Sequence, residues 1–192
     1  MNLNGLYFTN DWSLFLDRDG VISHRLPDDY VRQWQEFAFL PGALDALKIF
    51  GGIFGKIIVV SNQQGVGKGL MSPEGLMMID KEMKKAVAMA GGRIDASYYS
   101  PYLASENHPD RKPGTGMGLK AKSDFPEIDL SRSIMVGDSM TDMEFGRNLG
   151  MITVFISESR VQHELIDLTF RSLYDFALSL GKSMKLHRGS QS

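Results

Sequence analysis

The stretch Leu14-Phe15-Leu16-Asp17-Arg18-Asp19-Gly20-Val21 is an apolar run that stops at two acids spaced one residue apart. The run predicts a buried strand. Alternate residues of an extended chain point the same way, so Asp17 and Asp19 can converge where the backbone turns at Gly20. Two convergent carboxylates suit a hard divalent cation such as Mg2+. By itself, an Asp-x-Asp pair fits a solvated strand end equally well.

Short apolar runs alternate with longer segments of helical period along the rest of the chain. This alternation predicts an α/β fold, a Rossmann-like doubly wound parallel sheet with helices on both faces. The predicted strands are Ser13 to Asp17, Lys56 to Ser61, Ala96 to Tyr99, Ser133 to Gly137 and Ile152 to Ile156.

Helix start and stop signals lie between these runs. Pro41-Gly42 opens one helix, and Ser72 caps another whose core face is Leu76, Ile79, Met83 and Val87. Further helices are expected from about Gly116 to Phe125, from about Thr141 to Gly150, and from the capping box Ser172-Leu173-Tyr174-Asp175 through Leu180. We expect residues 1–180 to form a single domain and the polar, basic residues 181–192 to be a disordered tail.

Length and composition exclude several classes of protein. The 192 residues carry 21 basic and 23 acidic side chains, so no broad electrostatic attraction to nucleic acid is expected. No cysteine is present, which rules out disulfides and thiolate metal sites. The chain shows neither a signal-peptide pattern nor an apolar run of about 18 residues. We therefore expect a cytoplasmic protein without a membrane partner.

Four polar signals stand at strand ends or in the loops that follow. They are Asp17 with Asp19, Ser61-Asn62-Gln63, Arg111-Lys112-Pro113 in the long aperiodic piece from Ser100 to Gly116, and the stretch from Gly137 to Asp142. The carboxyl ends of parallel strands form one crevice, so these residues are expected to meet there.

Each signal also has an ordinary structural explanation. Ser61 is a common turn residue, Lys112 a common solvated lysine, and Asp142 a suitable acid for the first turn of a helix. Asp138 is harder to explain in this way, because an acid directly after an apolar strand needs solvent, a cation or hydrogen bonds. The joint pattern is much stronger than any single member.

In this order the motifs Asp17-Arg-Asp-Gly-Val, Val60-Ser-Asn-Gln, Arg111-Lys-Pro and Gly137-Asp-Ser-Met-Thr-Asp resemble the haloacid dehalogenase superfamily of phosphohydrolases. Together with Asp29-Tyr-Val and Phe39-Leu-Pro-Gly, they are similar to its histidinol-phosphatase and D,D-heptose 1,7-bisphosphate phosphatase branch. The resemblance spans roughly Leu14 to Ile156.

The resemblance implies a role for each motif. It makes Asp17 the nucleophile that takes the phosphoryl group and Asp19 the acid/base, which would need a raised or well-timed proton affinity. It implies Mg2+ held by Asp17, Asp138 and the backbone carbonyl of Asp19, with Asp142 in support. The transferring phosphate oxygens would be held by Ser61, Asn62 and Lys112, and Arg111 could fork onto a second phosphate.

The chain departs from this branch in one loop. The branch often carries a zinc loop just before Arg-Lys-Pro, with a Cys-Pro-His followed by Cys-x-Cys. Here the corresponding residues are Ser100-Pro-Tyr and His108-Pro-Asp, which make a poor set of ligands for tetrahedral zinc. We predict no structural zinc. The loop would then be ordered by its prolines, by packing of Tyr98, Tyr99 and Tyr102, or by hydrogen bonds, or else be mobile.

The space between Gly20 and Phe39 is too short for a separate cap domain, so we expect a minimal cap of loops only. It carries His24, Arg25, Asp28, Asp29 and Tyr30, which are candidates for substrate specificity, although a solvated turn around Pro27 explains the same composition.

Three functional hypotheses follow from the sequence. The first is a Mg2+-dependent phosphomonoesterase of a small metabolite, most like a heptose 1,7-bisphosphate 7-phosphatase, with histidinol phosphate as the alternative substrate. The second is a phosphoacceptor signalling domain, and the third a non-catalytic binding protein. The acid two residues beyond Asp17 favours turnover over storage of a phosphoryl group. We expect a monomer or a weak homodimer.

Overall fold

The computed structural model describes residues 8–26 and 29–189. Its centre is a six-stranded, all-parallel sheet in the order β3-β2-β1-β4-β5-β6. The strands are β1 (Ser13–Leu16), β2 (Lys56–Asn62), β3 (Ala96–Ser100), β4 (Ser133–Gly137), β5 (Ile152–Ile156) and β6 (Leu168–Phe170). The predicted doubly wound α/β fold is confirmed, and β6 is a strand that the sequence analysis did not anticipate.

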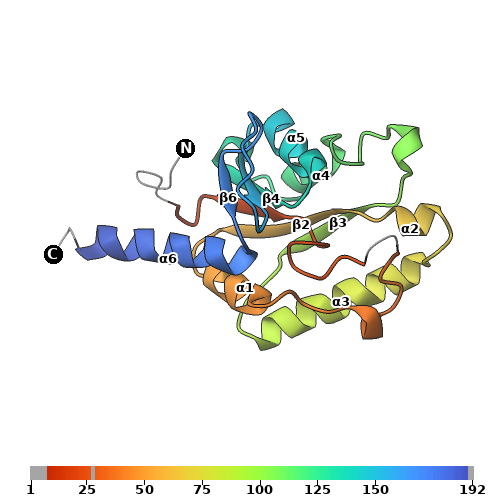
Figure 1. Ribbon diagram of the computed structural model, residues 1–192, viewed down its shortest axis with the longest axis horizontal. Coiled ribbons are helices and arrows are strands. Elements are labelled where there is room, and N and C mark those ends of the chain that lie inside the picture. Colours follow the sequence, from red (N-terminus) through yellow and green to blue (C-terminus); the bar gives the residue numbers. More distant parts are fainter. Residues whose placement is uncertain (1–7, 27–28, 190–192) are drawn as a thin grey trace.

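Helices cover both faces of the sheet. Figure 1 shows α1 (Ala43–Gly51), α3 (Pro73–Met89) and α6 (Leu173–Gly189) on one side, and α4 (Gly116–Asp124) and α5 (Met140–Asn148) on the other. The strands are apolar on both faces because each face packs against helices. Phe15 of β1 belongs to the core on the α4/α5 side, whereas its neighbours Leu14 and Leu16 belong to the core on the α1/α3/α6 side.

The capping signals act as predicted. The Ser72 hydroxyl accepts a hydrogen bond from the Gly75 amide at 3.0 Å, and the predicted face of α3 is buried. At α6 the Asp175 amide donates to the Ser172 hydroxyl at 3.0 Å. The expected end of this last helix at Leu180 is wrong, because α6 continues to Gly189. Residues 181–188 include lysine, methionine, leucine and arginine, which favour helix, so one glycine does not end it. Residues 190–192 of the predicted tail lie outside the described residues.

The order of the strands places the crevice. After β1 the chain proceeds to β2 and β3 on one side, and later to β4, β5 and β6 on the other. The strands β1 and β4 are therefore neighbours across the point where the winding direction changes, with Leu16 opposite Val136. A crevice forms beyond the carboxyl ends of such a strand pair.

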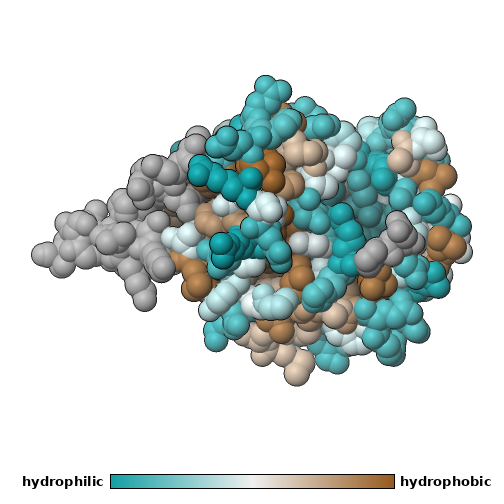
Figure 2. All heavy atoms as spheres, in the orientation of Figure 1, coloured by the Kyte–Doolittle hydropathy of each residue, from teal (hydrophilic) through white to brown (hydrophobic). Residues whose placement is uncertain are grey.

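Only loops and short turns stand over this crevice in the described part of the chain. Between β1 and α1 the chain makes two isolated bridges, Asp19 with Ser23 and Ser23 with Phe39, and one 3-10 turn, η1 (Trp34–Glu36). The minimal cap is thus as predicted. Figure 2 shows one side of the molecule, in the orientation of Figure 1, with hydrophilic residues over much of it and the hydrophobic ones in separate patches. Within the described ranges, no helix is both long enough and apolar enough to cross a bilayer.

Candidate active site

Lys112 lies at the centre of the crevice. Its side chain is buried, and its ammonium lies 3.0 Å from Asp17 Oδ1 and 2.6 Å from Asp142 Oδ1, and donates to the Val60 carbonyl at 2.7 Å. Burial would lower the pKa of Lys112, but the carboxylates of Asp142 and Asp17 outweigh it and raise that pKa. Lys112 is therefore a fixed positive charge that links the end of β1, strand β2 and helix α5.

The loop that carries Lys112 is held by Asn62. The Asn62 amide donates to the Lys112 carbonyl, and the Lys112 amide donates to Asn62 Oδ1, both at 3.0 Å. The resemblance implies that Asn62 holds phosphate oxygens, and in this structure its side chain also fixes the backbone of the neighbouring loop. Ser61 is buried in the cleft wall, where its hydroxyl accepts a hydrogen bond from Gln63 Nε2 at 3.1 Å.

Three carboxylates converge beside Lys112. Asp17, Asp138 and Asp142 each offer an oxygen within 4.8 Å of the others. Burial, together with Asp17, raises the pKa of Asp138 to about 7. Burial also raises the pKa of Asp17, against the opposing charge of Lys112. Asp17 Oδ1 and Asp142 Oδ1 are buried and receive no hydrogen bond, although both lie near the Lys112 ammonium. Such a set fits a hard divalent cation.

Gly20 makes room for this cluster. Its φ of +90° lies in the left-handed region, and a Cβ there would overlap the carboxylate of Asp138. Asp142 is held from the other side, since its Oδ2 accepts from the Ser139 amide at 3.1 Å and from the Ser139 hydroxyl at 2.6 Å at the start of α5. Asp142 is therefore fixed at the start of α5 and still offers an oxygen to the carboxylate cluster.

Asp19 points into a separate polar network. Its carboxylate accepts hydrogen bonds from Arg18 at 2.9 and 2.8 Å, from Gln63 Nε2 at 2.7 Å and from the Ser23 hydroxyl at 3.1 Å. Burial opposes ionisation of Asp19, but Arg18 and these hydrogen bonds outweigh it and lower the pKa. The resting structure thus differs from the expectation of a raised proton affinity.

Sequence reasoning assigned no role to Arg18 and did not connect Gln63 with Asp19. Arg18 is 1% exposed, and its guanidinium bonds Gln63 Oε1 at 3.0 Å and lies 5.9 Å from the centre of the Tyr99 ring. A charged residue in a motif gives no sign of burial by itself. The one sequence feature that could have indicated burial is the position of Arg18 between two acids, directly after a buried strand.

Cations stand around the mouth of the cleft, which has a volume of about 610 Å³. Arg25, Lys68 and Arg111 all line it. Arg111 donates to the Tyr102 carbonyl at 2.9 Å, and the Tyr102 ring stacks on His108 with 3.3 Å between ring centres. Of the tyrosines expected to order this loop, Tyr102 acts through the stack. Asp28 and Pro27 lie outside the described residues.

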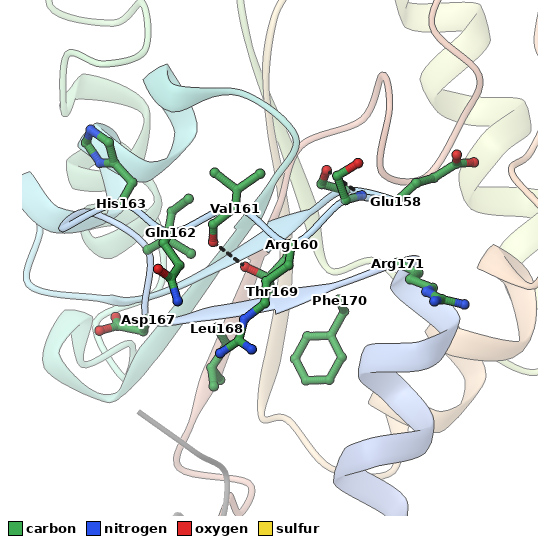
Figure 3. A pocket seen from close by; sticks show the side chains of 13 residues that line it. Glu158, Arg160, Val161, Gln162, His163, Asp167, Leu168, Thr169, Phe170 and Arg171 are labelled. Carbon is green, nitrogen blue, oxygen red and sulfur yellow. Dashed lines mark hydrogen bonds between the residues drawn. The ribbon is translucent and has the colours of Figure 1, made fainter.

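The predicted site residues Asp17, Asp19, Ser61, Asn62, Arg111, Lys112 and Asp142 all line this cleft, and Asp138 joins them through the carboxylate cluster. A second hollow lies at the β6 edge of the sheet, lined by residues 157–163 and 166–171. Figure 3 shows it, with the Thr169 hydroxyl donating to the Val161 carbonyl at 3.3 Å. It holds none of the predicted residues.

Known proteins are similar to this chain in sequence and in fold. Residues 110–172 match the profile of a family described as HAD-hydrolase-like. The chain is 38% identical over 176 residues to the D-glycero-alpha-D-manno-heptose-1,7-bisphosphate 7-phosphatase of Mycobacterium tuberculosis, covering 90% of this chain and 93% of that protein. It is 36% identical to the enzyme of that name from Burkholderia mallei, covering 75% and 78%.

Among solved structures, D,D-heptose 1,7-bisphosphate phosphatase from B. bronchiseptica, complexed with magnesium and phosphate, superposes with a TM-score of 0.80. The match has 25% identity and covers 89% of this chain and 98% of that one. Fold, site and relatives together define a phosphatase of the haloacid dehalogenase superfamily. Within that superfamily, the chain belongs to the D-glycero-D-manno-heptose 1,7-bisphosphate phosphatase family.

Proposed function

We propose that this phosphatase removes the 7-phosphate of a D-glycero-D-manno-heptose 1,7-bisphosphate with the help of Mg2+. The observation that carries the proposal is that Asp17 lines the cleft beside the Lys112 ammonium and converges with the carboxylates of Asp138 and Asp142. The relatives named for this reaction support the choice of substrate. The site combines a nucleophile, a fixed positive charge and a set of oxygen ligands, which phosphoryl transfer needs together.

The rim supports a substrate with a second phosphate. Arg25, Lys68 and Arg111 add positive charge beyond what one transferring phosphoryl group requires. Histidinol phosphate carries an amine and an imidazole where a bisphosphate carries its second phosphate, so the same cations disfavour it. One guanidinium nitrogen of Arg111 donates to the Tyr102 carbonyl, and this hydrogen bond holds the guanidinium beside the cleft.

The proposed reaction proceeds in two displacements. An Asp17 oxygen forms a bond to phosphorus while the bond from phosphorus to the substrate oxygen breaks, and Asp19 gives its proton to that oxygen. Asp19 then takes a proton from water, which attacks phosphorus and releases inorganic phosphate from Asp17. The pKa of Asp19 is lowered at rest, so the negative charge of the bound phosphate must raise it before the first step.

The remaining groups neutralise charge. Lys112 lies next to Asp17 and would face the transferring oxygens, while the Ser61 hydroxyl lines the same wall. A bound Mg2+ would supply further positive charge, so that two anions can approach one another. Asp17 and Asp138 would hold it, with Asp142 in support. The backbone carbonyl of Asp19, which the family resemblance implies as a ligand, would complete the set.

The test is release of inorganic phosphate by the purified protein with Mg2+. Heptose 1,7-bisphosphate, heptose 1-phosphate, heptose 7-phosphate and histidinol phosphate are compared at equal concentrations. We expect the bisphosphate to be preferred and Asp17→Asn to lose turnover by at least about 10⁴-fold, as the loss of a nucleophile does. Asp45→Asn, an exposed acid on α1, is the matched control. Preference for histidinol phosphate would refute the substrate, and activity in Asp17→Asn would refute the mechanism.

A further inference from the structure

Arg25 contacts the carboxylate cluster directly. Its Nη2 donates to Asp138 Oδ1 at 3.0 Å and to the Asp19 carbonyl at 3.4 Å. The two side chains differ in freedom, because that of Arg25 is 53% exposed and that of Asp138 is 18% exposed. The guanidinium is thus a loosely held cation on two groups that are themselves fixed.

These two groups are among those assigned to the divalent cation above. Asp138 belongs to the carboxylate trio, and the Asp19 carbonyl directly precedes Gly20, where a Cβ would overlap the Asp138 carboxylate. Lys112 contacts the other two carboxylates of the trio, Asp17 and Asp142. Each acid of the cluster therefore has a protein cation beside it, one from a buried lysine and one from an exposed arginine.

Arg25 and Asp138 line two different hollows. Arg25 lines the cleft, and Asp138 lines a separate hollow together with Gly20, Leu40 and Phe155. The hydrogen bond between their side chains therefore connects the cleft to the carboxylate cluster.

We propose that Arg25 is an internal counter-cation that competes with the divalent ion for Asp138, and that it moves into the cleft when the ion binds. The proposal rests on the metal site of the proposed function. Two cations cannot share Asp138 Oδ1 and the Asp19 carbonyl, because like charges at such short separation repel. Arg25 is the cation that leaves, since it is half exposed, whereas Lys112 is buried and held by three oxygens.

The displacement has a use in the cleft. The freed guanidinium remains tethered at the rim, where Lys68 and Arg111 also lie. It can then fork onto an anionic group of the substrate. Ion binding would in this way both complete the catalytic cluster and add a third cation for the non-reacting phosphate.

The test measures Mg2+ binding by isothermal titration calorimetry, without substrate. We expect Arg25→Gln to bind Mg2+ about two- to fivefold more tightly than the unaltered protein, which is the worth of a partly exposed ion pair. Arg32→Gln is the matched control, because Arg32 lies in the same segment, is 49% exposed and pairs with Asp29 instead. Its Mg2+ affinity should stay unchanged.

Two other outcomes are distinct. Equal Mg2+ affinity in Arg25→Gln and the unaltered protein, with binding lost in Asp138→Asn, would overturn the role of Arg25 and leave the metal site standing. Unchanged binding in Asp138→Asn would refute the metal site and the competition together. Added NaCl, at about ten times the buffer concentration, should narrow the difference in Mg2+ affinity between Arg25→Gln and the unaltered protein, because salt screens the exposed ion pair of Arg25 with Asp138.

Discussion

Asp138→Asn should make the metal-free protein more stable, and increasingly so as pH rises. The pKa of Asp138 is about 7 in the folded protein against 3.8 for an ordinary aspartate, and burial is the main cause. Between these two values the unfolded chain releases a proton that the folded chain keeps. The free energy of unfolding therefore falls as pH rises from about 4 to about 7. Above about pH 7 the stabilisation that came from the protonated Asp138 carboxyl is fully lost.

The magnitude follows from the two pKa values. A pKa difference of about three units means that the carboxyl of Asp138 destabilises the folded protein by about 4 kcal/mol at pH 8. At pH 5 this cost is only about 1.5 kcal/mol, because that pH lies only about one unit above the ordinary aspartate pKa. Asparagine does not titrate, so the variant escapes this cost at every pH. The gain of the variant over the unaltered protein should grow by about 2 to 3 kcal/mol between pH 5 and pH 8.

Urea unfolding in EDTA at the two pH values measures this gain. Taking the difference between variant and unaltered protein at each pH cancels the other titrating groups. Asp45→Asn on the surface of α1 serves as control and should show no such growth. A gain for Asp138→Asn that is the same at pH 5 and pH 8 would show that the carboxylate is not destabilised in the folded state. Added Mg2+ should stabilise the unaltered protein and leave the variant unaffected.

Two further variants test the construction of the site. Gly20→Ala combines a positive φ with displacement of Asp138, so Mg2+ affinity should fall at least about tenfold, whereas Gly69→Ala, with φ +68° and open space around it, should cost only about 1 kcal/mol of stability. Equal Mg2+ affinity in Gly20→Ala and Gly69→Ala would contradict the close approach of Gly20 to Asp138. Lys112→Met should cost about 3 to 5 kcal/mol in urea unfolding, because it leaves buried carboxylates unpaired. The exposed Lys120→Met should change stability by less than about 0.5 kcal/mol, and similar losses in both would refute this account.

The parts of the fold that the sequence predicted are those set by period and by caps. Strands β4 and β5 have the predicted bounds, and the core face of α3 is the predicted one, since apolar spacing alone decides which side of a helix is buried. Strand β6 was missed because it has three residues, of which only Leu168 is buried, and so few residues show no alternation. Its place is fixed by pairing with β5, which is a tertiary effect.

The same distinction applies to the site. The gathering of Asp17, Lys112 and Asp138 could be predicted, because parallel strands end at one edge and the family resemblance orders the motifs. The partners of Asp19 could not, since the guanidinium of Arg18 turns inward only in the context of the packed loop. Arg25 was expected merely as a rim residue, and its contact with Asp138 spans 113 positions of sequence, beyond the reach of any local pattern.

The three oxygens around the Lys112 ammonium come from the ends of β1 and β2 and from α5. The Lys112 ammonium therefore holds these elements together and also supplies positive charge beside the nucleophile. A substitution of Lys112 changes the stability of the fold and the charge of the site together. Selection for a new substrate has more freedom at the rim, where Lys68 and Arg111 contact none of the three clustered carboxylates. The enzyme's catalytic floor and its choice of substrate can evolve at different speeds.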